Sequence, residues 1–249
     1  MRYLESGSND PAFNLALEQY AFDALSHADD FTMLWKNRDC VVVGVNQSTL
    51  DEINAQYIED NAIPVVRRLS GGGAVYHDLG NLNFTFITRV GDIADSFEVS
   101  MRPIADALAS LDLDVCLSGR NDMTLGDSKI SGSAQYLKDG KLMHHGTLLF
   151  DTNLEKMSKA LRVSDEKLAS KGIKSVRSRV TNIREHLTED MTMDEFFTHM
   201  RRAIAGSVPA YDLCAHDMQA INEIKRARYD TQEWNFGKSP DELVKFVVL

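Results

Sequence analysis

The sequence is short of the residues that mark several large classes of protein. It has three cysteines, Cys40, Cys116 and Cys214, which lie far apart and form no C-x-x-C pair. Such a set excludes a disulfide framework or a zinc ribbon and is typical of a reducing compartment. No stretch approaches the roughly 20 apolar residues of a membrane span, and "MRYLESGSNDP" lacks the apolar centre of a signal peptide. We therefore expect a cytoplasmic protein that does not contact membranes.

Basic residues are also in deficit. The chain carries 27 Lys and Arg against 37 Asp and Glu, a net charge of −10, which argues against nucleic acid as a partner. The segment from Lys156 to Arg184 departs from this balance, with nine basic and two acidic residues. It is either a solvated helix face or a patch that attracts an anionic ligand or an acidic partner protein.

The common catalytic motifs are absent. A Walker A loop would need Gly at position 232, five residues before the "GKS" at 237–239, and that residue is Gln. The triple glycine at 71–73 lacks the later Gly of a dinucleotide fingerprint, and no G-x-S-x-G or H-E-x-x-H occurs. Cys116 lies in the alternating pattern "LDLDVCLSG", so we interpret it as a buried structural thiol and not as a nucleophile.

The order of elements predicts the α+β class. A composition of 43% apolar and 26% charged residues is ordinary for a globular domain. Periodicity and turn residues predict helices that begin after Asp10-Pro11 and that cover 48–61, 100–113, 154–161, 193–205 and 221–229. Strands are predicted at 31–36, 40–47, 63–66, on both sides of the "DLGN" turn, and at 129–137 and 142–151. This order does not alternate regularly between strand and helix, so we predict a mixed or antiparallel sheet.

Three polar, glycine-bearing stretches remain as candidates for a site. They are "RRLSGGGAVYHD" (67–78), "SGRNDMTLGDSKISGSAQ" (118–135) and "HHGTLLF" (144–150). Glycine loses more backbone entropy on folding than any other residue, so the triple glycine is either a tight turn or a place of close backbone approach. Backbone N–H groups left open by small residues, with Arg68 and Lys129 nearby, would form an anion cradle without a Walker loop.

These stretches resemble blocks of the lipoate–protein ligase family, relatives of the biotin–protein ligases. The resemblance covers most of residues 9–240 and is carried, in family order and spacing, by "NLALEQ", "RRLSGGGAVYHDLGN", "SGRND", "KISGSA", "HHGTLL", "KGIKSVRSRVTN" and "EWNFGKSP". It implies a biotin/lipoate–protein ligase-like catalytic domain with a mixed sheet over residues 1–249. It also implies an ATP-dependent ligase that converts lipoate to lipoyl-AMP, releases pyrophosphate, and passes the lipoyl group to a lysine.

The resemblance further implies partners and cofactors. The acceptors would be lipoyl domains of 2-oxoacid dehydrogenase complexes and the glycine cleavage H protein, and ATP and Mg²⁺ would be required. Longer members of the family carry an accessory domain after the "W-N-F-G" segment, so we expect that domain to be absent or to form a separate accessory subunit. The apolar "VKFVVL" at 244–249 would suit a strand that pairs with such a partner.

Carried over to matching positions, the resemblance implies roles for single residues. Lys129 would contact the lipoyl carboxylate and the α-phosphate, where a fixed ammonium stabilises growing negative charge. Arg68 would hold phosphate, Asn121 and Asp122 would meet the adenylate, and Asp122 would be the Mg²⁺ ligand. The full ATP and lipoyl-AMP site would comprise Arg68, Ser70, Gly71, Gly72, Gly73, Ala74, Val75, Tyr76, His77, Asn121, Asp122, Lys129, Ser131, Gly132, Ser133, Ala134, His145, Gly146 and Thr147.

Two interpretations concern the neighbours of this site. His77 and Asp78 could form a catalytic dyad, but we favour a structural role because acyl-adenylate chemistry needs positioning more than an enzyme base. The apolar tail of lipoate needs apolar walls. These walls, or else ordinary core residues, are Leu15, Leu17, Val43, Val45 and Leu69.

Other functions stay open at this stage. An octanoyl or lipoyl amidotransferase of the same superfamily passes its acyl group through a cysteine just before the "K-[IL]-x-G-S-A-Q" block, where this chain has "GRNDMTLGDS" without cysteine. A non-catalytic module that binds lipoate or lipoylated proteins would not require Lys129 beside Asn121 and Asp122. Biotin ligation is disfavoured because the glycine-rich loop of that family has a different pattern.

Overall fold

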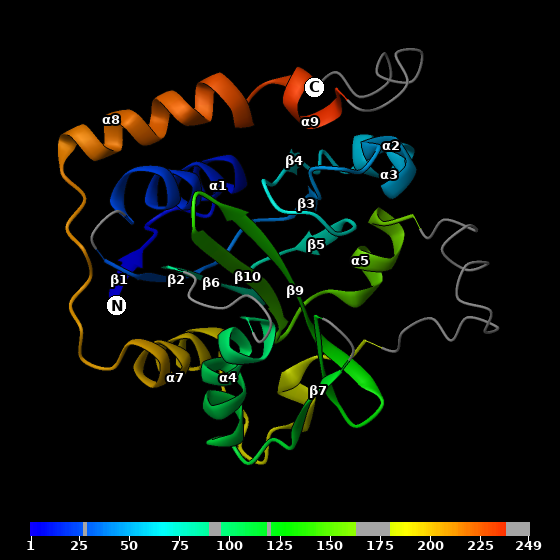
Figure 1. The fold of residues 1–249 in the computed structure, drawn as a ribbon. Helices are drawn as coiled ribbons and strands as arrows, with labels where there is room; N and C mark the ends of the chain where they lie inside the picture. Colours follow the sequence, from blue (N-terminus) through cyan, green and yellow to red (C-terminus); the bar gives the residue numbers. More distant parts are fainter. Residues whose placement is uncertain (27–28, 90–95, 119–120, 163–179, 238–249) are drawn as a thin grey trace.

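The centre of the molecule is a seven-stranded sheet (Figure 1). The structure is a computed structural model and describes residues 1–26, 29–89, 96–118, 121–162 and 180–237. In spatial order the strands are β1 (Arg2–Glu5), β2 (Phe31–Trp35), β6 (Asn81–Arg89), β10 (Lys141–Leu149), β9 (Ser128–Lys138), β8 (Asp122–Leu125) and β7 (Val115–Ser118). β1 and β2 run parallel and the other neighbours antiparallel, so the predicted mixed sheet is confirmed.

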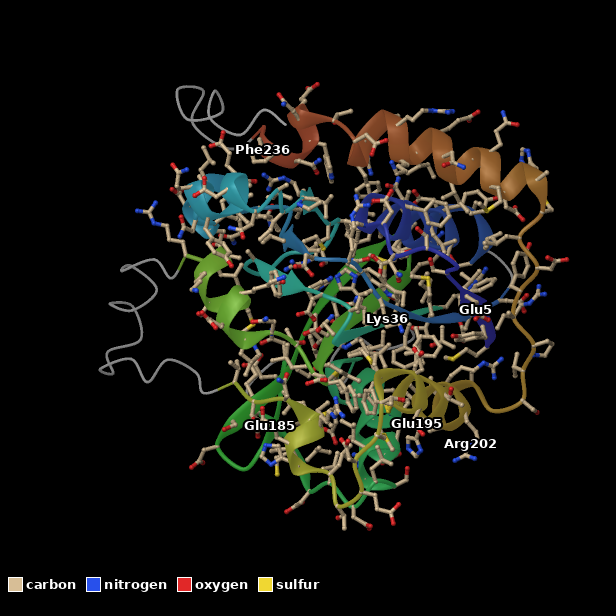
Figure 2. The ribbon with its side chains drawn as sticks, turned by 180° about the vertical axis from the view of Figure 1, so that it is seen from behind. Glu5, Lys36, Glu185, Glu195, Arg202 and Phe236 are labelled. Atoms are coloured by element: carbon tan, nitrogen blue, oxygen red, sulfur yellow. The ribbon has the colours of Figure 1, made fainter. Side chains whose placement is uncertain are left out.

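One face of this sheet packs on two helices, α4 (Ser96–Ala109) and α7 (Met193–Ala205). Successive residues of a strand point to opposite faces, and alternate residues of β6, among them Phe84 and Phe86, are buried here against Ile104 and Phe196. The short 3₁₀ helix η2 (Ile183–His186) adds Ile183 to the same core. The end of the molecule with Glu185, Glu195 and Arg202 lies opposite the end with Phe236 (Figure 2).

The opposite face, which we call the inner face, is covered by a helix and a second sheet. The helix is α1 (Pro11–Tyr20), which continues as the π-helical η1 (Ala21–Leu25). The second sheet has the order β4 (Val65–Arg67), β3 (Cys40–Val43) and β5 (Val75–His77). Met33 and Ile87 of the large sheet, Leu15 of α1 and Val42 of β3 share one buried cluster. The inner face is therefore enclosed between two sheets and a helix.

Further helices cover the outside of these elements (Figure 1). α8 (Ala215–Ile224), continued by the π-helical η3 (Lys225–Tyr229), packs on α1. The outer face of the small sheet meets α2 (Thr49–Glu52), α3 (Ala55–Asp60), α5 (Leu154–Ala160) and α9 (Gln232–Phe236) in a third core cluster. No helix in the described ranges is both long and apolar enough to cross a membrane.

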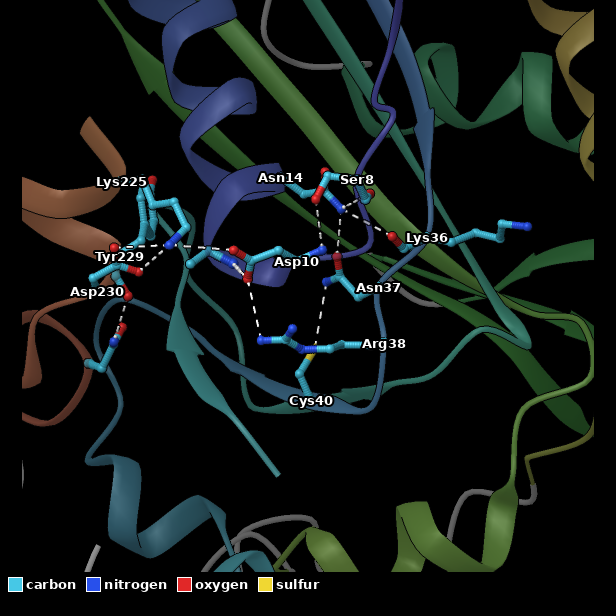
Figure 3. Close-up of polar contacts among 12 residues, drawn as sticks. Ser8, Asp10, Asn14, Lys36, Asn37, Arg38, Cys40, Lys225, Tyr229 and Asp230 are labelled. Carbon is cyan, nitrogen blue, oxygen red and sulfur yellow. Dashed lines mark hydrogen bonds and ion pairs between the residues drawn. The ribbon is translucent and has the colours of Figure 1, made fainter. Parts of the chain in front are cut away.

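The start of α1 is fixed by its own sequence. Asp10 caps the helix by accepting a hydrogen bond from the backbone N–H of Ala12 at 3.2 Å, and Pro11 follows, as predicted. The buried Asn14 side chain donates to the Lys36 carbonyl at 3.1 Å and to Asn37 Oδ1 at 2.8 Å (Figure 3). These bonds attach the helix to the segment after β2, which sets its position over the inner face.

Several sequence-based boundaries differ from the structure. β1 was not predicted, because four residues of strand with two buried positions give little signal without their partner β2. The helix expected at 221–229 begins earlier, at Ala215, and the helix expected at 100–113 spans Ser96–Ala109. Cys116 does lie in a strand, but the prediction that it is buried is wrong: β7 is an edge strand and the thiol is exposed.

Candidate functional site

The three polar stretches converge on the inner face. Ser70 Oγ lies 2.6 Å from His145 Nε2, which joins the first stretch to the third. Ala134 is the strand partner of His145 across the β9–β10 pair, which places the second stretch beside them. Residues separated by up to 75 positions thus share one site.

Arg67 ends β4 and Arg68 follows it, and the two side chains point in opposite directions, as neighbours in an extended chain do. Arg68 Nε donates to Ser70 Oγ at 3.0 Å, and its two NH groups donate to the carbonyls of Val42 at 3.1 Å, Gly71 at 2.6 Å and Gly73 at 2.9 Å. Burial lowers the pKa of Arg68 to about 10, so the guanidinium stays charged near neutral pH. Three of its five N–H donors therefore hold the glycine loop (residues 70–73) from within, and a fourth attaches the loop to β3.

Within the triple glycine, Gly72 is the residue at which this close packing requires glycine. Gly72 has φ 91°, a left-handed conformation that side chains rarely adopt. A Cβ on Gly44, just after β3, would lie 2.0 Å from the Gly72 carbonyl oxygen. The loop is closed on its other side by Glu52, whose Oε2 accepts the backbone N–H of Ala74 at 2.9 Å. Glu52 was not identified from the sequence.

Arg67 binds the small sheet to α9 and not to the site. Its Nε donates to the Trp234 carbonyl at 2.7 Å, and its NH groups donate to the Gln47 carbonyl at 2.7 Å and to Thr49 Oγ1 at 2.7 Å. The Trp234 indole N–H returns a bond to the Arg67 carbonyl at 2.8 Å. This gives the "EWNFG" motif a structural function that its sequence alone did not indicate.

Lys129 lies on β9 beside an acidic partner. Its Nζ is 2.7 Å from Asp122 Oδ1 on the neighbouring strand β8. A Cβ on Gly132 would lie 3.0 Å from this ammonium, so the glycine leaves the room that the ion pair occupies. The Lys129 carbonyl accepts the N–H of Thr181 at 3.1 Å, which places the chain after residue 179 alongside this strand.

Asn121 supports the same strand. Its side-chain amide donates to the Ser133 carbonyl at 2.9 Å, and its carbonyl accepts the Ser133 N–H at 2.8 Å. Ser131 is buried, and its hydroxyl has no hydrogen-bond partner among the described residues. Asn121 therefore has a structural role in addition to the one proposed for it.

A buried carboxylate that the sequence analysis did not select lies at the centre of the inner face. Glu18 of α1 is 2% exposed. Its Oε1 lies 2.8 Å from His145 Nδ1 and accepts the Thr85 hydroxyl at 2.7 Å. A Glu among the apolar positions of α1 was the available signal, because charged side chains are almost never fully buried unless paired.

His77 and Asp78 have surroundings that fit the structural role. Burial lowers the pKa of His77 to about 3, so the ring is neutral, and its Nδ1 accepts from the Asn37 side chain at 3.1 Å. The Asp78 carboxylate accepts the backbone N–H groups of Gly80 at 2.9 Å and Asn153 at 2.8 Å. Both carboxylate oxygens are thus occupied by the chain itself.

The remaining site residues lie around this centre. Val75 is half-buried and Tyr76 fully buried in β5. Gly146 packs beneath the ring of Phe84, where a Cβ would come within 2.5 Å, and Thr147 Oγ1 lies 3.5 Å from the Gly132 N–H. Of the expected apolar walls, Leu15, Leu17 and Val43 are buried in core clusters. Val45 and Leu69 are half-buried.

The described residues offer little to a metal ion on their own. Within them, no three His, Cys, Asp or Glu side chains are grouped so that they could hold one. Asp122 Oδ1 is already paired with Lys129. Mg²⁺ in nucleotide sites is usually held by phosphates and one or two carboxylates, so this donor set fits only a metal that phosphates largely bind.

Most of the basic segment lies outside the described residues, since these omit 163–179. The basic side chains at its ends are ion-paired at the surface. Lys156 pairs with Asp39 at 2.6 Å, and Arg184 pairs with Asp151 at 2.7 Å and with Asp190 at 2.7 Å. The choice between a solvated face and a binding patch stays a prediction.

Comparison with known proteins shows which proteins this chain resembles. Residues 10–205 match the model of the lipoyl protein ligase A/B catalytic domain. The chain is 46% identical over 238 residues to lipoate-protein ligase LplJ of Bacillus subtilis (strain 168), covering 93% of this chain and 72% of that protein. It is 41% identical over 244 residues to lipoate-protein ligase 1 of Staphylococcus aureus, covering 96% of this chain and 74% of that protein.

Solved structures agree. A bi-partite lipoate protein ligase of Thermoplasma acidophilum, described with its E2 lipoyl domain, has a TM-score of 0.82 and 28% identity, covering 97% of this chain and 98% of that one. A lipoate-protein ligase A bound with ATP has a TM-score of 0.81 and 25% identity, covering 95% and 98% of the two chains. The chain therefore belongs to the lipoyl protein ligase A/B catalytic-domain family, the family of the lipoate–protein ligases.

Proposed function

We propose that the inner-face site performs ATP-dependent lipoate–protein ligation with Lys129 at its chemical centre. The observation that carries the proposal is the convergence of the Lys129–Asp122 pair, the small residues of β9 and the glycine loop on one enclosed sheet face. Relatives named as lipoate-protein ligases over most of the chain, and a related ligase bound with ATP, support the activity.

The reaction has two steps. In the first, a carboxylate oxygen of lipoate attacks the α-phosphorus of ATP, the bond to the leaving pyrophosphate breaks, and lipoyl-AMP forms. In the second, the amine of an acceptor lysine attacks the acyl carbon, loses a proton, and AMP leaves with the bond pair. The first step brings two anions together and the second releases AMP as an anion, so a fixed ammonium in a partly buried site would lower the repulsion in the first and stabilise the leaving AMP in the second.

The side chains divide this work as follows. Lys129 exchanges Asp122 for the carboxylate and α-phosphate when the substrates bind. The glycine loop and the backbone of Ala74 to Tyr76 line the nucleotide. Arg68 was expected to hold phosphate, but because four of its N–H donors bond within the protein, we propose that it holds the loop in shape. Mg²⁺, held by the phosphates with Asp122 as its carboxylate, would neutralise charge on the leaving pyrophosphate.

We also propose which proteins accept the lipoyl group. Acceptors are lipoyl domains of 2-oxoacid dehydrogenase complexes and the glycine cleavage H protein; the Thermoplasma ligase described with its E2 lipoyl domain supports the first. We further propose that efficient adenylation needs an accessory domain, as a further part of the chain or as a separate subunit, and that the reaction takes place in the cytoplasm.

Lys129→Ala tests the proposal directly. Because removing one preorganised donor to a developing charge costs ~10²–10³ in rate, we expect lipoate-dependent pyrophosphate release to fall by about that factor. Lys138→Ala is the matched control, because Lys138 is an exposed residue of the same strand, and should leave turnover unchanged. Undiminished turnover in Lys129→Ala would refute the role of Lys129.

The same assay tests the accessory domain and the acceptors. The chain is incubated with ATP, Mg²⁺, lipoate and an acceptor domain, with and without candidate accessory proteins, and the acceptor is weighed by mass spectrometry. Robust pyrophosphate release by the chain alone would remove the need for a partner. Acylation of the acceptor without ATP, when an acylated carrier protein is added as the donor, would favour an amidotransferase instead.

A further inference from the structure

Two chains of hydrogen bonds converge on one oxygen beneath the glycine loop. In the first, Trp35 Nε1 donates to Thr85 Oγ1 at 3.0 Å, and the Thr85 hydroxyl donates to Glu18 Oε1 at 2.7 Å. Because an indole N–H can only donate, the direction of this chain is fixed. It ends on a carboxylate, which can only accept.

The second chain reaches the same oxygen from the glycine loop. Arg68 Nε donates to Ser70 Oγ at 3.0 Å, Ser70 Oγ lies 2.6 Å from His145 Nε2, and His145 Nδ1 lies 2.8 Å from Glu18 Oε1. Guanidinium only donates, so Ser70 Oγ accepts from Arg68. In the tautomer whose Nδ1–H faces the Glu18 carboxylate, His145 Nε2 accepts the hydrogen bond of the Ser70 hydroxyl. Each group in this chain therefore determines the orientation of the next.

Because these side chains are buried, each needs its hydrogen-bond partner within the protein. Glu18 is 2% exposed, Ser70 1%, His145 6% and Arg68 7%. The four bonds of the Arg68 guanidinium go to carbonyl and hydroxyl oxygens, which carry no charge. Glu18 and Glu52 supply the negative charge that favours the protonated guanidinium. A charge placed in such an interior needs this compensation.

We propose that Glu18 and His145 are positioning residues for the nucleotide: through Ser70 they fix Arg68, and through Arg68 they fix the glycine loop in its ATP-binding shape. This inference rests on the proposed function. It differs from a role in which Glu18 and His145 only line the space for the acyl chain, because that role would leave ATP binding unaffected.

A double-mutant cycle tests the inference. Glu18→Gln keeps the size of the side chain and removes its charge, and Ser70→Ala cuts the link between the two ends of the chain. Hydrogen bonds to charged groups are the stronger ones, so we expect each variant to raise the KM for ATP by about 10-fold. The double variant should also show about a 10-fold rise, and not the ~100-fold rise of two independent effects.

Binding of a non-hydrolysable ATP analogue, measured by calorimetry, gives a second readout that does not depend on turnover. The dissociation constant should follow the same pattern. Glu98→Gln, on the exposed surface of α4, is the matched control and should leave both quantities unchanged. Should Glu18→Gln fail to fold, His145→Gln takes its place in the cycle with the same expectation.

The outcomes separate the two proposals. A wild-type chain that binds the analogue but never forms lipoyl-AMP, even with accessory proteins, refutes the proposed function and leaves the analogue data to decide on Glu18. Variants that change only the KM for lipoate, or whose effects on ATP binding multiply in the double variant, overturn the positioning role.

Discussion

Replacing Arg67 by lysine should destabilise the protein far more than a conservative change suggests. Arg67 is 1% exposed, and its guanidinium bonds to the Trp234, Gln47 and Asn235 carbonyls and to Thr49 Oγ1 at 2.7 to 3.1 Å. Lysine has three donors on one nitrogen and lacks the planar fork. It would leave at least two buried oxygens without a partner, at ~1–3 kcal/mol each. We therefore expect the free energy of unfolding to fall by about 3–4 kcal/mol.

Guanidinium chloride unfolding, followed by circular dichroism, measures this loss. The chain has two tryptophans, and Trp234 bonds to the Arg67 carbonyl, so its fluorescence reports whether α9 detaches first. Arg38→Lys is the matched control, because Arg38 is exposed and its Asp10 partner is 3.7 Å away; its midpoint should match the wild type. A loss below about 1 kcal/mol in Arg67→Lys would mean that lysine and water satisfy these acceptors, and would refute the reasoning.

Three further predictions concern the loop, the pH response and the cysteines. Gly44→Ala places a Cβ 2.0 Å from the Gly72 carbonyl, so it should cost about 1–3 kcal/mol and raise the KM for ATP, whereas Gly7→Ala, with no atom within 4 Å, should change neither. Burial lowers the pKa of His77 and of His144 to about 3 from 6.5. The unfolded chain therefore binds more protons between these values, and stability should be complete above pH 6.5 and decline toward pH 3; denaturant midpoints should show a shallower decline in His144→Gln. A variant with alanine at all three cysteines should still ligate lipoate, and loss of transfer at normal stability would point to a thioester route.

The sequence predicted those features of the fold and the site that depend on residues close together in the chain. Asp10 and Pro11 specify the start of α1, and the short gap between the strands predicted at 129–137 and 142–151 specifies the β9–β10 hairpin. The three polar stretches could be recognised because their glycines and small residues are locally unusual.

The features that the sequence did not predict depend on contacts between residues that are far apart in the chain. Glu18 meets Thr85 67 residues away and His145 127 residues away, and Arg67 meets Asn235 168 residues away. Arg68 was expected in the site, but neighbouring residues could not show that Arg67 instead binds α9. The exposure of Cys116 depends on β7 lying at the edge of the sheet, which only the complete strand order determines.

Gly146, which packs beneath Phe84, affects the register of β10 against β6. The histidine pair at 144–145 would let the strand slip by one position and still present a histidine to each face. Gly146 removes that ambiguity, because a Cβ there would come within 2.5 Å of the Phe84 ring, and either neighbour shifted into its position would bring one. The absence of a Cβ at this position thus favours the register in which His145, and not His144, faces the glycine loop.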